Sequence, residues 1–192
     1  QTSDMAKILG IHLEGIFLNP EKKGIHNPEH FMKLTAENYK LIEDNFIKII
    51  TLAPELDEGL LDYLSDKDIK IQAGHCKGGD LSKCTGCTHL FNAMSGITHR
   101  ESSTALSALI ADGVHVSDEA LKLVFKTKPQ DKIILISDSL PITKSNLTEM
   151  LFADEKVYYD GIKATSKEGT LAGSTALLPD VIKRLAVIGL FN

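Results

Sequence analysis

The sequence predicts an α/β protein in which parallel β-strands alternate with α-helices. Short apolar runs at 8–15, 47–52 and 70–73 have the length of buried strands. The segments between these runs carry apolar residues at helical spacing, and polar residues stand at the carboxyl ends of the runs. Strands that alternate with helices in this way build a parallel sheet with the helices outside.

Composition limits the classes of function. The 192 residues are 43% hydrophobic and carry a net charge of −5, so the chain has enough apolar material for a sizeable core. The mildly acidic balance argues against a nucleic-acid partner. Since the sequence has no long apolar run, basic amphipathic segment or signal peptide, we expect no membrane partner and a cytoplasmic location.

Chain length restricts the fold. A complete eight-stranded α/β barrel usually needs about 250 residues, so any barrel built from this chain must be incomplete. The chain begins with Gln1 rather than Met, and we therefore expect it to start inside a longer reading frame.

The first half of the chain carries the clearest alternation. The run 8–15 is apolar on both faces, which predicts a buried parallel strand with Glu14 near its carboxyl end. The segment 19–29 is polar and broken by two prolines, so we expect a loop without regular elements. The elements expected next are a helix capped by Thr35 with Tyr39, Ile42 and Phe46 on one face, a strand at 47–52, a helix at 59–64 capped by Asp57, and a strand at 70–73.

Two links in the chain interrupt the alternation. Residues 76–86 are polar and contain glycine, and residues 100–110 are interrupted by serines. A crossover between parallel strands usually needs a dozen or more residues, so the link between His75 and His89 is short. We therefore expect segments to be missing from the sequence near 76–88 and 100–110.

The alternation returns in the last third of the chain. Ser117 is expected to cap a helix, and 133–136 is expected to form a buried strand. The segment 152–165 alternates around Asp160-Gly161, a strong hairpin signal, and is expected to be an insertion over the mouth of the barrel. A last helix carries Leu178 and Leu185.

Acidic and histidine side chains at the strand ends point to a metal site. Glu14, His75 and His89 each stand at the end of an apolar segment or within it, and the carboxyl ends of parallel strands share one edge. Catalytic zinc typically takes three nitrogen or oxygen ligands and leaves one position for water. A histidine beside a strand is more often a hydrogen-bonded core residue, and that alternative stays open.

Further candidates lie near the same edge. Asp138 follows the strand at 133–136 and predicts a general base that later acts as an acid, although Ser-Asp after a strand commonly just caps a turn. Arg100 is suited to hold a phosphate through two N–H groups or to form an exposed salt bridge. His26 and His115 follow glycine-containing loops, and their alternative is a surface position.

The three cysteines do not suit a disulfide framework, because their number is odd. Cys84-Thr-Gly-Cys87 followed by His89 imitates a structural zinc motif, but no second pair of ligands stands at zinc-ribbon spacing. We expect reduced thiols at Cys76, Cys84 and Cys87, with a small zinc scaffold as the alternative.

Together these motifs resemble the N-acetylglucosamine-6-phosphate deacetylase family of the amidohydrolase superfamily. The matching blocks are 10–15, 23–28, 51–55, 73–75, 88–94, 112–115, 137–138 and 169–174. The resemblance covers nearly the whole chain, and the block Thr-His-Leu-Phe-Asn-Ala-Met at 88–94 is specific to this family. One departure is Ile16, where the family usually has proline.

For the fold, the resemblance implies an incomplete (β/α)8 TIM-type barrel of the metal-dependent hydrolases. Residues 1–192 would form one partial catalytic domain that lacks the first and last barrel strands and the β-sandwich domain. It also implies a homodimer in which Arg100 and His115 reach the site of the neighbouring subunit.

The resemblance also implies roles for individual residues. Glu14, His75 and His89 match the metal ligands of one divalent ion per subunit, with zinc favoured and iron as the alternative. Asp138 matches the catalytic acid/base. The positions implied to bind substrate are Ile25, His26, Asn92, Ala93, Arg100, Asp112, Gly113, Val114, His115, Leu171, Ala172 and Gly173, with His26 helping to polarise the amide carbonyl.

The implied reaction is hydrolysis of the N-acetyl group of N-acetylglucosamine 6-phosphate, in amino-sugar catabolism. Asp138 would take a proton from the activated water and return it to the departing amine, giving acetate and glucosamine 6-phosphate. The alternative is a sugar-phosphate-binding barrel without metal or turnover. Such a binding protein has no need of three metal ligands and an acid/base together, which favours the enzyme.

Overall fold

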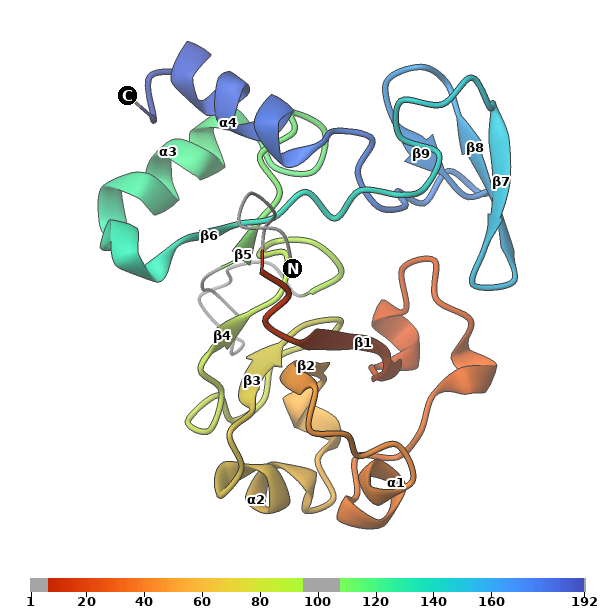
Figure 1. Cartoon of the computed structure of the whole chain (residues 1–192), viewed down its shortest axis with the longest axis vertical. Coiled ribbons are helices and arrows are strands. Elements are labelled where there is room, and N and C mark those ends of the chain that lie inside the picture. Colours follow the sequence, from red (N-terminus) through yellow and green to blue (C-terminus); the bar gives the residue numbers. More distant parts are fainter. Residues whose placement is uncertain (1–6, 95–107, 192) are drawn as a thin grey trace.

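The computed structural model describes residues 7–94 and 108–191, and its frame consists of two parallel sheets and one antiparallel sheet (Figure 1). The larger parallel sheet has the order β1 (Ile11–Phe17), β2 (Ile47–Leu52), β3 (Lys70–Ala73) and β4 (Gly86–Cys87). In the smaller one, β5 (Ala108–Leu109) pairs in parallel with β6 (Ile134–Leu135). The antiparallel sheet comprises β7 (Glu149–Phe152), β8 (Glu155–Tyr159) and β9 (Ala164–Thr165).

The strands agree with the sequence in the interior of the larger sheet and differ at its edge. β2 and β3 have the predicted bounds. β1 begins three residues later than expected and continues to Phe17, and Ile8 and Leu9 are each 78% exposed. The prediction of a buried strand over 8–15 was therefore wrong for its first half. The reason is position, because β1 pairs with β2 alone among the described strands.

β6 also differs from expectation in its burial. The predicted strand at 133–136 is present as β6, but Ile134 is 48% exposed. β6 has a single partner, β5, within the described part of the chain. An apolar run therefore predicted the strand correctly and its burial incorrectly.

Two helix starts follow the predicted caps. Thr35 accepts a hydrogen bond from the Asn38 N–H at the start of α1 (Ala36–Lys40), and Ser117 accepts one from the Ala120 N–H at the start of α3 (Asp118–Thr127). The predicted cap of α2 (Leu60–Ser65) was wrong, because its N-cap is Gly59, although the Asp57 carboxylate accepts the Leu61 N–H. The last helix is α4 (Leu178–Val187).

Two local predictions in the first half were wrong. α1 ends at Lys40, so Ile42 and Phe46 do not lie on it, and Phe46 is 64% exposed. Near that end the Asp44 carboxylate accepts the Phe46 N–H at 2.7 Å, a local bond that competes with helix formation. The expected loop at 19–29 contains two 3-10 helices, η1 (Pro20–Lys22) and η2 (Pro28–His30). Each begins with an asparagine cap followed by proline, which favours a helical start.

The core lies on the outer side of the parallel strands. One apolar cluster joins β1–β3 to α1 and α2, and a second joins β3–β5 to α3 and α4. A third cluster, which contains Ile25, Leu140, Val157 and Ala172, places β8 beside the loop after β1. The helices therefore cover the outside, and the antiparallel sheet lies beside the strand ends (Figure 1). No described helix has both the length and the apolar character needed to cross a membrane.

The segment around the hairpin signal forms two tight connections. Asp160 accepts the N–H groups of Ile162 and Lys163 in the turn between β8 and β9. The preceding turn between β7 and β8 has positive φ angles at Ala153 (49°) and Asp154 (66°), as a two-residue type I′ hairpin requires. The antiparallel segment thus begins with β7, upstream of the expected start at 152.

Candidate metal centre

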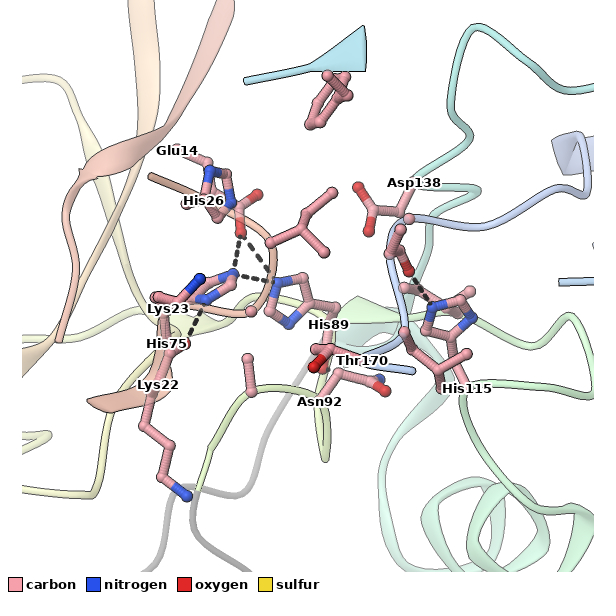
Figure 2. Close-up of a pocket in the computed structure, with 18 of the residues that line it drawn as sticks. Glu14, Lys22, Lys23, His26, His75, His89, Asn92, His115, Asp138 and Thr170 are labelled. Carbon is pink, nitrogen blue, oxygen red and sulfur yellow. Dashed lines mark hydrogen bonds and ion pairs between the residues drawn. The ribbon is translucent and has the colours of Figure 1, made fainter. Parts of the chain in front are cut away.

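The side chains of Glu14, His75 and His89 meet at one point (Figure 2). Glu14 Oε1 lies 3.1 Å from His75 Nε2 and 2.9 Å from His89 Nε2, and the two Nε2 atoms are 3.0 Å apart. The residues come from β1 and from the segments that follow β3 and β4. The parallel sheet therefore gathers side chains that are up to 75 positions apart in the sequence.

This donor set fits a divalent metal ion. Two imidazole nitrogens and one carboxylate oxygen are typical ligands of catalytic zinc. Ligands on a tetrahedral zinc ion lie about 3.3 Å apart, given bonds of about 2.0–2.1 Å. The separations of 2.9–3.1 Å differ from that value by only a few tenths of an ångström. The two Nε2 atoms also bring lone pairs together unless a proton or a cation lies between them.

A second compact group replaces His89 with His26. Glu14, His26 and His75 each offer a ligand atom within 4.8 Å of the others. The group with His89 is the more compact of the two, because all three of its separations are near 3 Å. The His26 ring stands edge-on to His75, with ring centres 5.0 Å apart, and so lies beside the metal ligands.

The backbone is strained where these side chains are presented. The φ angles of His75, His89 and Asp138 are 49°, 30° and 51°. Non-glycine residues rarely adopt positive φ, and each such residue costs about 1–3 kcal/mol. Strain of this kind concentrates at functional sites, where the surrounding structure holds it in place.

The other ring nitrogen of each histidine has a different environment. His75 Nδ1 donates a hydrogen bond to the Lys22 carbonyl at 2.8 Å, which leaves the Nε2 lone pair free for a ligand. His89 Nδ1 is buried and has no hydrogen-bond partner within residues 7–94 and 108–191. The orientation of His75 is therefore the better defined of the two.

The pKa values of Glu14 and Asp138 shift in opposite directions. Burial would raise the pKa of Glu14, but its hydrogen bonds with His75 and His89 outweigh burial and hold the pKa well below its usual range. Burial would lower the pKa of His89, yet Glu14 raises it on balance. Burial raises the pKa of Asp138. One carboxyl group is thus kept ionised, and the other more readily holds a proton.

These groups line a cavity of about 720 Å³, a size typical of small-molecule sites. Asp138 faces the three ligand side chains from the opposite wall (Figure 2). The predicted residues on the cavity wall are Glu14, Ile25, His26, His75, His89, Asn92, Ala93, His115, Asp138, Leu171, Ala172 and Gly173. Asp112, Gly113 and Val114 do not line the cavity, and Arg100 lies outside the described residues.

Asp112 lies behind His115 and fixes it. One carboxylate oxygen of Asp112 lies 2.8 Å from His115 Nδ1 and 2.7 Å from the Ser174 hydroxyl, and the other accepts the His115 backbone N–H. His115 Nε2 is 2.8 Å from the Ala172 carbonyl oxygen. Both ring nitrogens therefore face acceptors, as in an imidazolium. Burial opposes this charge, but Asp112 outweighs burial and raises the pKa of His115.

His26 is the uncharged histidine of the cavity. Burial, followed by the nearby His75, lowers the pKa of His26 to about 4. A neutral ring keeps one N–H donor, which is the group needed to hydrogen-bond a carbonyl oxygen. His26 and His115 thus differ in charge across the cavity, because His115 has a carboxylate hydrogen-bond partner and His26 has none among the described residues.

Several wall residues carried no clear signal in the sequence. Phe91, Leu140 and Phe152 supply apolar surface, and Lys22 supplies both surface and the carbonyl that holds His75. The position of Phe152 in the predicted hairpin over the mouth is the one signal that could have indicated its role.

Comparisons with known proteins agree with these observations. No protein-family model matches the chain. The N-acetylglucosamine-6-phosphate deacetylase of Bacillus subtilis is 37% identical over 190 residues, which cover 88% of this chain and 48% of that protein. The N-acetylgalactosamine-6-phosphate deacetylase of a Shewanella species is 30% identical over 207 residues, covering 96% of this chain and 52% of that protein.

Structural similarity points in the same direction. The crystal structure of N-acetylglucosamine-6-phosphate deacetylase from Thermotoga maritima matches with a TM-score of 0.85 at 30% identity, covering 94% of this chain and 54% of that one. The chain therefore spans about half the length of the relatives that it matches.

Proposed function

We propose that this chain, a homologue of the N-acetylglucosamine-6-phosphate deacetylases, carries out metal-dependent hydrolysis of the N-acetyl group of N-acetylglucosamine 6-phosphate. The products are glucosamine 6-phosphate and acetate. The observation that carries the proposal is the convergence of Glu14, His75 and His89, with Asp138 on the facing wall.

The fold proposed for this activity is one partial catalytic domain, 1–192, with the incomplete (β/α)8 barrel of the amidohydrolase superfamily. The parallel pairs β1–β4 and β5–β6 support it, as do the helices packed outside them. The first and last barrel strands and the β-sandwich would lie outside this chain, and the sheet β7–β9 would be an insertion at the mouth. Segments missing near 76–88 and 100–110 would account for the short strands β4 and β5.

Glu14, His75 and His89 would hold one divalent ion, with zinc favoured and iron as the alternative, since imidazole and carboxylate ligands accept either ion. When bound, the ion polarises the acetyl carbonyl and makes a hydroxide nucleophile available at neutral pH. Glu14 supplies the negative charge of the set, and its low pKa keeps that charge near neutral pH.

Asp138 moves the proton. Its carboxylate accepts a proton from the attacking water and returns it to the departing amine nitrogen. Burial raises the pKa of Asp138, which helps its carboxyl group hold the proton between the two steps. The neutral His26 donates a hydrogen bond to the acetyl oxygen, and the cationic His115 attracts the sugar phosphate.

A cytoplasmic homodimer belongs to the same proposal, with residues shared across the interface. His115 lines the cavity of its own chain, together with Asp138. Arg100 lies outside the described residues, and the sharing of Arg100 and His115 across the interface stays a prediction.

The test is an acetate-release assay with N-acetylglucosamine 6-phosphate, combined with zinc analysis. Replacing Asp138 with Asn should lower the rate by about 10²–10⁴-fold, because the general acid/base is lost. Substrate and zinc should still bind. Unchanged acetate release in Asp138→Asn would exclude this mechanism, and tight sugar-phosphate binding without turnover or zinc would favour the metal-free binding barrel.

The same assay addresses the zinc-scaffold alternative. Burial raises the pKa of the Cys84 thiol to about 11, which disfavours the thiolate that zinc requires. Cys84→Ser should therefore keep its zinc and its activity, whereas loss of zinc and unfolding in this variant would support the scaffold.

A further inference from the structure

One carboxylate oxygen ties together the segments that follow three neighbouring strands. Glu55 lies in η3 (Pro54–Leu56), after β2. Its Oε1 accepts a hydrogen bond from Asn19 Nδ2 at 2.8 Å and another from the Lys77 backbone N–H at 2.6 Å. Asn19 begins the segment after β1, and Lys77 lies in the segment after β3. The Glu55 side chain therefore connects the segments that follow β1, β2 and β3.

Asn19 connects Glu55 to His75 through η1. The Asn19 side chain is buried, and its Oδ1 accepts the Glu21 N–H at 2.8 Å, which fixes the first turn of η1. η1 ends at Lys22, whose carbonyl receives the hydrogen bond from His75 Nδ1. The Asn19 backbone N–H also donates to the His75 carbonyl oxygen at 3.0 Å. The segment 19–22 therefore holds His75 by both its ring and its main chain.

Glu55 itself is tightly enclosed. Gly79 has a φ of 98°, and a Cβ atom there would lie 2.7 Å from the Glu55 backbone nitrogen, so the chain after Lys77 packs directly on Glu55. Glu55 Oε2 is buried and has no hydrogen-bond partner among the described residues. Leaving a buried carboxylate oxygen unpaired costs free energy. Glu55 stays buried despite this cost, with two hydrogen bonds to its Oε1.

We propose that Glu55 and Asn19 are positioning residues for the metal site, acting through the Lys22 carbonyl on the tautomer and orientation of His75. A neutral imidazole can carry its proton on either nitrogen. The Lys22 carbonyl selects Nδ1–H and directs the Nε2 lone pair towards Glu14 and His89. This inference rests on the proposed metal site and adds two residues to it, neither of which touches the ion.

The decisive variant is Asn19→Asp, which keeps the cap on η1 but replaces the Nδ2 donor with an oxygen facing Glu55. Loss of hydrogen bonds behind a ligating histidine typically weakens metal binding by about 10–100-fold. We expect a loss of this size in the zinc affinity of the 192-residue chain, measured by competition with a coloured chelator. The added negative charge would by itself strengthen cation binding, so charge cannot produce the loss.

A second substitution should rescue the first. In Asn19→Asp combined with Glu55→Gln, an amide nitrogen in the place of Oε1 donates to the new carboxylate, which restores the contact with residue 19 but not the one with the Lys77 N–H. The double variant should therefore regain part of the lost affinity. Rescue by a compensating change distinguishes positioning from general damage.

Two controls address the removal of a carboxylate, as in Glu55→Gln, and the loss of stability. Glu58→Gln removes a carboxylate three positions along the chain, where Glu58 forms an exposed ion pair with Lys33 at 3.3 Å. Leu64→Ala removes a buried side chain from α2, in the apolar cluster outside the sheet, and should lower the free energy of unfolding. Both should keep the zinc dissociation constant within about twofold of the unchanged chain.

The outcomes separate this inference from the metal site itself. Full zinc affinity in Asn19→Asp, or an equal loss in Leu64→Ala, overturns the inference while the metal site stands. If the double variant binds no better than Asn19→Asp, the Glu55 link is likewise rejected. If the unchanged chain binds no zinc, the proposed function fails, and this inference fails with it.

Discussion

The two walls of the cavity are built in different ways. The β1–β4 wall contributes Glu14, His75 and His89, whose ligand atoms lie 2.9–3.1 Å apart with two imidazole nitrogens facing each other. The wall after β5 contributes Asp112 and His115, in which both ring nitrogens of His115 and both oxygens of Asp112 have partners. The first wall needs a cation or a proton between its nitrogens, whereas the His115–Asp112 pair of the second wall is already satisfied.

The difference indicates how the proposed chemistry is divided. A set of facing lone pairs is suited to take up an ion, and a satisfied ion pair is suited to stay fixed while a substrate binds. Asp138 faces the first wall from the side of His115, and both His89 and His115 act on its pKa. Changes to the first wall should therefore act on metal binding, and changes to the second on stability and substrate binding.

The largest effect on stability is expected for Asp112→Asn. The substitution leaves the buried cation of His115 without its carboxylate, and breaking a buried pair typically costs about 3–5 kcal/mol. Urea unfolding of the metal-free chain measures this loss. Asp131→Asn serves as the control, since it breaks only the exposed pair with Lys132 and should cost at most about 1 kcal/mol. Equal losses in the two variants would mean that the second wall is not held by this pair.

The pH dependence of the same pair is the next expected effect. The pKa of His115 is raised above 6.5. Its contribution to the free energy of unfolding is therefore complete below that pH and is lost as the pH rises through the folded-state pKa. The pKa of Asp112 is lowered below 3.8, so its contribution is present above that pH and is lost as the pH falls through the folded-state value. The pair should therefore stabilise most between about pH 4 and pH 6.5.

A comparison of the unchanged chain with His115→Ala tests this window. The difference between their free energies of unfolding should be largest within it and should shrink on the alkaline side. A difference that instead grows as the pH rises towards 6.5 and then stays constant would show that His115 is neutral in the folded protein.

The smallest effect is expected for His30→Ala, at the contact between η2 and the β7–β8 turn. His30 Nε2 lies 2.9 Å from Asp154 Oδ2, and both side chains are exposed. Exposed ion pairs contribute about 0–1 kcal/mol, so thermal unfolding should change little. A loss comparable to that of Asp112→Asn would show that the antiparallel sheet, rather than the buried pair, holds the cavity together.

The sequence predicts well where one strong local pattern decides the structure. The apolar runs of β2 and β3 gave their bounds, and Ser117 gave the start of α3. The exposure of β1 was not predictable from its own residues, because burial of a strand depends on what pairs with its other edge. The two 3-10 helices were not predicted, because a proline is typical both of loops and of helix starts.

In the candidate site, too, some features were predictable from the sequence and others were not. The convergence of Glu14, His75 and His89 was predictable, because parallel strands bring their carboxyl ends to one edge. The positive φ angles of His75 and His89 depend on the surrounding packing. The link between Asn19 and Glu55 joins side chains 36 positions apart in loops, where no periodic pattern exists to reveal it.

Zinc stoichiometry tests the central claim most directly. The account predicts one zinc ion per chain, measured by elemental analysis after dialysis against trace zinc. His75→Ala and His89→Ala should each lose this ion, whereas Cys84→Ser should retain it. Retention of the full zinc content in both histidine variants would contradict the claim that these side chains share one ion with Glu14.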